Sequence, residues 1–463
     1  MAIRVVAVSS LLLMLVAGCE IGPGYVHPRV DIPNDWRFKD STASVVASTF
    51  WWEQFHDTVL SALITEALDR NIDVRIAAAR EEEFLGAYVT TRASLFPEAG
   101  YAASAGKTRV SPNAQLAPLQ NPYSSFPLNV NASWQIDIWG KLRRASEAAR
   151  ADFLATSAAH RAVMLTVVAS VAGSYVNLLD LDLQLDIAKR TAQSREDSYN
   201  LFKLQFERGV ISELELCQAE AEWRQALSTI APLEKDIDRQ ENALSIILGR
   251  NPGPIGRIVN IDKLTLPDVP ARLPCSLLVH RPDIVSAEEQ LVAANARIGV
   301  ARAYFLPTID LTGLFGWAST QLSNLLTGPS QAWNYSANIS GLIFSGGAAS
   351  GLRKTVEAEK EQALLRYRQS ILSALTDVEN ALANQKQTKL ELQTLQRQVD
   401  ALRNVDHYAR LRYANGYTSY IEVLDAERSL FAAEVSLAQV KGQVLLALID
   451  LYTAMGGGWK VER

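Results

Sequence analysis

The sequence contains few of the residues that bind metals, form disulfides or contact nucleic acid. Its 463 residues include only five histidines and three cysteines, with no histidine pair at metal-ligand spacing and no Cys-x-x-Cys pair. A net charge of −5 argues against nucleic acid as a partner. The nucleotide-binding loop G-x-x-x-x-G-K-[ST] is absent. No serine or cysteine has a recognisable catalytic base nearby. From these absences together we predict no metal, no bound cofactor and no enzyme activity.

The first 18 residues have the pattern of an export signal. Arg4 precedes a short apolar run at residues 5–16, and Val16-Ala17-Gly18-Cys19 follows. A run this short is typical of a signal peptide rather than a membrane span. Small residues directly before a cysteine favour cleavage before Cys19 and its acylation; ordinary cleavage with an incidental cysteine is the alternative. Acyl chains contribute roughly 0.8 kcal/mol for each buried methylene, so several would hold the chain to a bilayer.

Beyond the signal, the sequence has no uninterrupted apolar run of 18 or more residues. We therefore expect no transmembrane helix. If the chain crosses a membrane, it must do so as a closed β-barrel, because only helices and closed barrels satisfy every backbone hydrogen bond in lipid.

The two halves of the chain repeat each other. Residues 71–97 align with residues 281–307 at an offset of 210, which matches Pro97 to Pro307. The segments around Gly209 and Gly416 align at an offset of 207. Because several separated segments agree, we predict a tandem duplication of one unit of roughly 200 residues.

Alternating segments predict two strands in each repeat. At residues 126–138 apolar side chains occupy the even positions and polar ones most of the odd positions, a period of two that gives one apolar and one polar face. Transmembrane barrel strands and soluble β-sandwiches both show this alternation, which by itself leaves both open. The strands are expected at about 97–108, 125–138, 305–318 and 333–345.

Long helices account for most of the remaining sequence. Residues 140–248 and 351–455 contain little glycine or proline, and their apolar residues recur at spacings of three and four. Such seams are typical of coiled-coil packing. Helices of roughly 45–55 residues would be about 70–80 Å long and too polar for lipid, so we expect helical bundles in water.

The number of strands constrains the assembly. Four strands per chain cannot close a barrel, for which about eight are needed. Two chains would give a barrel already filled by side chains, whereas three would leave a pore. We predict a mainly α-helical chain with transmembrane β-structure that forms a homotrimer, with a 12-stranded β-barrel continued by a 12-helix α-barrel.

The expected domains follow from these patterns. They are a signal peptide (1–18), a lipidated N-terminal segment (19–57), repeat 1 (58–249), a linker (250–280), repeat 2 (281–456) and a C-terminal tail (457–463).

Several motifs are specific in combination. They are the cysteine-terminated signal, Trp51-Trp52-Glu53-Gln54-Phe55, Arg281-Pro282-Asp283-Ile284, Ala293-Ala294-Asn295-Ala296-Arg297-Ile298-Gly299 with Ala301-Arg302-Ala303, Leu424-Asp425-Ala426-Glu427-Arg428, and Leu451-Tyr452 with Gly456-Gly457-Gly458-Trp459. With these motifs the sequence resembles the outer-membrane factor family, the TolC/OprM-type efflux lipoproteins, over essentially its whole length. The resemblance implies a trimeric barrel in the outer membrane, an α-helical tunnel across the periplasm and a small mixed equatorial domain. It also implies a passive exit duct that meets a periplasmic membrane-fusion adaptor and an inner-membrane pump, here of the RND type.

Two other functions stay open at this point. A type I protein-secretion duct would have the same fold, and a lipid-anchored coiled-coil structural protein would lack a pore. The alternating segments and the repeat argue against the second.

The resemblance also implies a periplasmic gate after the second hairpin turn, formed by Ile421, Glu422, Asp425 and Arg428. Threefold symmetry would turn the two acidic positions into stacked carboxylate rings, which select for cations. Pairing with the arginine would keep the aperture shut, and the isoleucine would add an apolar plug. The alternative is an ordinary solvated helix face. The corresponding residues of the first repeat are Glu215, Gln218 and Ala221, so closure should depend on the second hairpin.

The turns of the two long helical hairpins are the second predicted site, because the family uses them to contact the adaptor. Glycine at each turn supplies the positive φ that a tight helix end needs. The residues are Arg208, Gly209 and Val210 in the first turn and Asn415, Gly416 and Tyr417 in the second.

Overall fold

The computed structural model describes residues 21–29, 36, 50–111, 113, 121–257, 260–264 and 281–457. Cys19, Trp459 and most of the predicted linker lie outside these residues. The chain divides into two compact units. The first contains Arg80–Ser157 and Ser286–Arg368 with the N-terminal segment up to Arg29, and the second contains the remainder.

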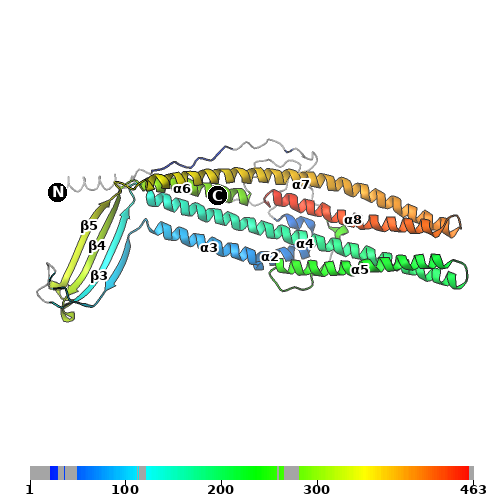
Figure 1. The fold of residues 1–463 in the computed structure, drawn as a ribbon, viewed down its shortest axis with the longest axis horizontal. Coiled ribbons are helices and arrows are strands. Elements are labelled where there is room, and N and C mark those ends of the chain that lie inside the picture. The colour runs from blue at the N-terminus through cyan, green and yellow to red at the C-terminus, as the bar shows by residue number, and fades with distance from the viewer. Residues whose placement is uncertain are drawn as a thin grey trace. The chain divides into compact units, whose positions relative to one another are not determined.

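The first unit contains an antiparallel sheet in the order β1–β3–β4–β5, with β2 also pairing with β3 (Figure 1). The residue numbers of every pair between β3 and either β1 or β2 sum to 231, so β1 and β2 continue one strand. The interruption lies opposite Pro127, which accepts a hydrogen bond from Ser104 but has no N–H to return. The strands are β1 (Glu98–Ala103), β2 (Gly106–Thr108), β3 (Tyr123–Ile136), β4 (Thr308–Ser319) and β5 (Gln331–Ser340).

The sheet therefore has four strand positions. No other described strand covers the outer edge of β1 and β2 or that of β5. Both edges leave backbone N–H and C=O groups for another strand to pair with.

The helices are of unequal length. Each long hairpin joins a 67-residue helix to a 35-residue helix, where the sequence had led us to expect 45–55 residues throughout. The prediction was wrong because the turn lies well past the middle of each glycine-poor stretch. The helices are α2 (Thr58–Arg70), α3 (Ile72–Ala93), α4 (Lys141–Glu207), α5 (Glu213–Ile247), α6 (Pro282–Ala303), α7 (Ala348–Ala414) and α8 (Tyr420–Ala454), with short 3-10 turns at Trp51–Phe55, Ile261–Lys263, Leu322–Asn324 and Gly328–Ser330.

The tandem duplication is reproduced residue for residue. Shifting the bounds of α3 by 210 gives α6, and shifting those of α4 and α5 by 207 gives α7 and α8. The three-residue difference lies in the loop between the strands, which has 14 residues between Thr108 and Tyr123 but 11 between Ser319 and Gln331.

The second unit buries two of the sequence motifs in its core. Trp51 is fully buried and stacks on Tyr452 of α8, with ring centroids 5.3 Å apart. The hydroxyl of Tyr452 donates to the side-chain oxygen of Gln54 at 2.9 Å. The Trp-Trp-Glu-Gln-Phe and Leu-Tyr motifs therefore pack against each other, although Gln54 and Tyr452 are 398 residues apart in the sequence.

Two helices differ from the expectation that none could cross a membrane. The helices α4 and α8 each contain an 18-residue stretch that is apolar enough to do so. About half of each stretch, 44% and 56%, is buried inside the chain's own packing. We therefore interpret both stretches as core-facing parts of packed helices.

The four hairpin helices end in the same way. Gly209, Gly249, Gly416 and Gly456 have φ values of 71°, 72°, 73° and 83°. At the first, Gly209 donates its N–H to Phe206 and Val210 donates to Gln205, both at 2.8 Å. This Schellman pattern satisfies the last carbonyl groups of the helix and needs left-handed backbone, which glycine adopts without strain.

We expect Gly249→Ala to be much more destabilising than Gly209→Ala. In both variants, an alanine in left-handed backbone lowers the free energy of unfolding by about 1–2 kcal/mol. A Cβ on Gly249 would also lie 2.3 Å from the carbonyl oxygen of Arg70, whereas one on Gly209 meets nothing within 4 Å. Displacing that backbone adds about 1–3 kcal/mol. Thermal unfolding followed by circular dichroism checks the order, and equal loss in the two variants would contradict it.

Candidate functional site

The two hairpin tips pack against each other through an aromatic cluster. Phe202 of α4 lies 4.3 Å from Tyr420 of α8, and Tyr413 of α7 lies 5.4 Å from Tyr420, measured between ring centroids. Ala219 of α5 completes the contact. All four hairpin helices contribute, so the cluster holds the two hairpins of one chain together at this end.

Each turn carries an exposed apolar side chain directly after its glycine. Val210 is 69% exposed and Tyr417 is 79% exposed. The side chain of Asn415 donates to the carbonyl of Leu411 at 2.7 Å, which fixes the second turn from within. The predicted tip residues therefore lie at hydrogen-bonded turns, with Arg208 and both glycines exposed.

The predicted gate residues do not all share one face of α8. Ile421, Asp425 and Arg428 are exposed and follow the i, i+4, i+7 spacing of a single helix face. Glu422 is half-buried and faces α7 instead. Its carboxylate contacts Arg412 at 3.3 Å and accepts a hydrogen bond from the Thr418 hydroxyl at 2.5 Å.

The position of Glu422 has a local explanation. Its counterpart in the first repeat, Glu215, forms a capping box with Ser212: its carboxylate accepts the Ser212 N–H at 2.9 Å, and its own N–H donates to the Ser212 hydroxyl at 3.4 Å. A capping box satisfies N–H groups that the first helical turn leaves unpaired. Glu422 holds the equivalent turn of α8 through Thr418.

Arg428 pairs with a residue that the sequence did not single out. Its guanidinium donates to the carboxylate of Glu222 on α5, at 2.8 Å from Nε. We had expected its partner to be Glu422 or Asp425 on the same helix. The hydrogen bonds that Arg428 donates to Glu222 raise the pKa of Arg428 above its ordinary value, so the link persists wherever the carboxylate is ionised.

Glu222 is itself buried between two arginines. Arg195 of α4 contacts its carboxylate at 3.0 Å and donates to its backbone carbonyl at 3.1 Å. The side chains of Arg195 and Glu222 are only 5% and 8% exposed, whereas that of Arg428 is 59% exposed. A buried carboxylate thus links α4 and α5 of the first hairpin to α8 of the second.

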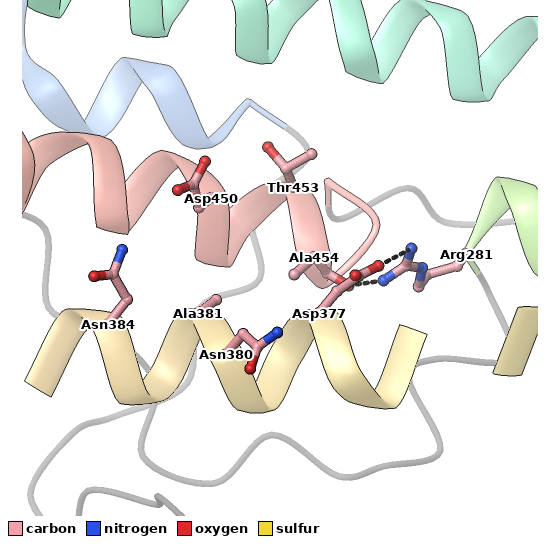
Figure 2. A pocket seen from close by; sticks show the side chains of 8 residues that line it. All are labelled: Arg281, Asp377, Asn380, Ala381, Asn384, Asp450, Thr453 and Ala454. Atoms are coloured by element: carbon pink, nitrogen blue, oxygen red, sulfur yellow. Dashed lines mark hydrogen bonds and ion pairs between the residues drawn. The ribbon is translucent and has the colours of Figure 1, made fainter. Parts of the chain in front are cut away.

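A second polar cluster surrounds Arg281, just before α6. Its guanidinium donates to Asp377 of α7 at 3.0 Å and to the Ala454 carbonyl at the end of α8 at 2.7 Å (Figure 2). It also contacts Asp283 at 2.8 Å. Burial alone would lower the pKa of Arg281, but the two carboxylates outweigh it and raise the pKa.

The repeat explains what this cluster does. Asn71 occupies the position of Arg281 in repeat 1, and its amide donates to the Ile247 carbonyl, the counterpart of Ala454, at 2.7 Å. The Arg-Pro-Asp motif is therefore a helix-end clasp. A cavity of about 420 Å³ beside it, between α7 and α8, is lined by Asn384, Asp450 and their neighbours (Figure 2). Within the described part of the chain, no group of His, Cys, Asp or Glu side chains could hold a metal ion.

The fold and these sites define a class of membrane channel subunits, in which a sheet with uncovered edges is joined to duplicated helical hairpins. The chain belongs to the outer membrane efflux protein family: the family model matches residues 63–250 and again residues 273–457. One match falls on each repeat, which confirms the duplication predicted from the sequence.

Relatives and solved structures cover nearly the whole chain. It is 35% identical to the probable outer membrane lipoprotein SilC of Salmonella typhimurium, over 99% of each chain. Crystal structures of CusC match with a TM-score of 0.85 and 34% identity, over 95% of this chain and 100% of that one. The Campylobacter jejuni CmeC outer membrane channel matches with a TM-score of 0.89 and 25% identity, over 96% of each chain. The predicted family and fold class are thereby confirmed.

Proposed function

We propose that this chain is the outer-membrane channel component of a tripartite efflux system, and that it forms a passive homotrimeric exit duct across the periplasm and outer membrane. The observation that best supports this is the four-position sheet with two uncovered edges. Unpaired backbone groups in lipid cost several kcal/mol each, so the edges must pair with other copies. Three copies give twelve strands, enough to enclose a pore.

The different environments of α3 and α6 support a ring. α6 packs on α4, where Arg297 contacts Asp152 at 2.5 Å, and on α7, where Ile298 meets Val356. Its counterpart α3 leaves Val89 57% exposed. If the repeats are equivalent around a ring, the α7 helix of a neighbouring copy supplies the contact that α3 lacks.

The remaining parts of the proposal concern anchoring and partners. Acyl chains on Cys19 would attach the mature chain to the outer membrane. A periplasmic membrane-fusion adaptor and an inner-membrane pump of the RND type would supply selectivity and energy, since the chain has no nucleotide-binding loop of its own. The relatives include a "cation efflux system protein" and a "toluene efflux pump outer membrane protein". We infer that the exported substrates are small toxic solutes.

Mass measurement in detergent tests the assembly, and susceptibility tests the function. Detergent-extracted protein should have the mass of three chains and should open ion-conducting pores in planar bilayers. A strain lacking the gene should become more sensitive to drugs or metal ions, and the intact gene should restore resistance. A monomer that inserts no pores would overturn the proposal.

The gate is proposed to lie on the exposed face of α8. Three copies of Asp425 would form one acidic ring at the periplasmic end of the duct. Ile421 would lie one helical turn nearer the tip of the second hairpin. The Arg428–Glu222 link would hold this face against the first hairpin of the same chain. Glu422 would act indirectly, by fixing the turn from which α8 begins.

The turns are proposed to contact the adaptor. We expect Val210→Asp combined with Tyr417→Asp to abolish resistance while leaving trimers intact, because both side chains are mostly exposed in the chain. The conservative pair Val210→Thr and Tyr417→Phe serves as the control and should retain resistance. Resistance of the aspartate variant at the parental level would rule out this contact.

A further inference from the structure

The sheet contains an internal test of how closely the two repeats correspond. In the first hairpin, the paired residues of β1 and β3 have numbers that sum to 231. Shifting one strand by 210 and the other by 207, the two offsets of the repeat, predicts a sum of 648 for the second hairpin. The pairs of β4 and β5 do sum to 648, as for Thr308 with Ser340. The register of a hairpin is therefore preserved by the duplication.

The same operation can be applied to the junction between the repeats. There β3 pairs with β4, and the numbers sum to 445, as for Phe126 with Ser319. The counterpart of β3 is the edge strand β5, and the counterpart of β4 is the other edge, β1 with β2. Adding 207 and subtracting 210 turns the sum of 445 into 442.

We propose that β5 of one copy pairs antiparallel with β1 and β2 of the next copy, in the register where the two residue numbers sum to 442. This proposal rests on the proposed function, in that it takes the neighbour to be a second copy of this chain in a closed ring. It places Ser340 opposite Ala102, Asn338 opposite Ser104 and Asn334 opposite Thr108 of the neighbouring copy.

The side chains support this register. Because the sum is even, the face of β5 that carries Ala337 and Ile339 meets the face of β1 that carries Tyr101 and Ala103. A shift by one residue would place these apolar side chains on opposite faces of the sheet. The polar face then pairs Asn338 with a serine.

A tyrosine–glycine pair supplies a second, independent agreement. Inside the chain, Tyr335 lies opposite Gly313, and a Cβ on that glycine would be 3.3 Å from the tyrosine ring. Tyr101 is 86% exposed on the β1 edge. In the proposed register it lies opposite Gly341 of the neighbouring copy, so the same aromatic cover of a glycine recurs at the seam.

Cysteine cross-linking distinguishes this register from its nearest competitors. Directly opposite residues have Cβ atoms about 4.5–5.5 Å apart, close enough for a disulfide, whereas diagonal neighbours lie about 7–8 Å apart. In a background with Cys217 and Cys275 replaced by serine, Ser104→Cys is combined with Asn338→Cys. The matched controls combine Ser104→Cys with Ser336→Cys or Ser340→Cys, which shift the register by two residues on the same face. Ala103→Cys with Ile339→Cys repeats the test on the other face.

Mild oxidation should link chains covalently into trimers in the Ser104–Asn338 or the Ala103–Ile339 variant. The trimers should appear on a denaturing gel as bands that a reducing agent removes. The shifted controls should form at least several-fold less covalent trimer. Efficient linkage only in a shifted control, or none in any variant while native trimers persist, would overturn the register and leave the exit duct standing. Failure of the parental chain to form trimers at all would overturn both.

Discussion

Glu222→Ala should lower the free energy of unfolding by about 3–5 kcal/mol, the cost of leaving a buried charge without its partner. The charge left behind is that of Arg195, whose side chain is only 5% exposed and contacts the Glu222 carboxylate at 3.0 Å. Water cannot compensate at that depth. Glu222→Gln keeps the shape but loses the charge, and should recover only part of the loss.

Arg428→Ala provides the matched control, because it removes the other arginine from the same carboxylate. Its side chain is 59% exposed, so the stability cost should stay below about 1 kcal/mol. The charged link between the two hairpins is nevertheless lost, although their aromatic contact remains, and bilayer conductance should rise. Thermal unfolding followed by circular dichroism gives the first quantity, and single-channel recording gives the second. Equal unfolding temperatures for Glu222→Ala and the parental chain would contradict the buried link.

The local features of the fold could be predicted from the sequence. Alternation at residues 126–138 indicated a strand, the glycine-poor stretches indicated long helices, and the offsets of 210 and 207 carried the features of one repeat onto the other. The strand and helix signals are contained in short segments, where the period of the apolar residues indicates the type of secondary structure. The offsets need only the comparison of two segments.

The partner of Arg428 could not be predicted in this way. Glu222 lies 206 residues from Arg428 and 27 from the arginine on its other side, on three different helices. It is one of several glutamates on α5, and the neighbouring sequence does not indicate that this one forms a buried ion pair. Only the packing of the hairpins brings the three charges together.

Glu422 illustrates the opposite case, in which the signal was present but was read for another function. The sequence Ser-x-x-Glu occurs at residues 212–215 and again at 419–422, and this pattern is typical of a capped helix start. The resemblance to efflux channels drew attention to the negative charge instead. In the structure the carboxylate is engaged by Thr418 and Arg412, which leaves Asp425 as the exposed acid of this turn.

Replacing both acids, Glu422→Ala together with Asp425→Ala, should raise bilayer conductance. Asp425→Ala alone should account for most of that increase. In a trimer the three Asp425 carboxylates would narrow the aperture and attract cations, as acidic rings do in other pores. Truncation to alanine removes both the bulk and the charge. Conductance should rise several-fold, and the preference for cations should fall.

Two single variants separate the contributions of charge, size and turn stability. Asp425→Asn keeps the size, so it should weaken cation preference with little change in conductance. Glu422→Ala should leave the cation preference near the parental value, because its carboxylate faces α7, while lowering the unfolding temperature through loss of the Thr418 and Arg412 contacts. Recordings at low salt sharpen the comparison, since exposed charges are screened over about 10 Å at 0.1 M salt. If the double variant kept the parental conductance, the gate could not lie on this face of α8. If Glu422→Ala raised conductance more than Asp425→Ala, the acidic ring would be formed by Glu422 and not by Asp425.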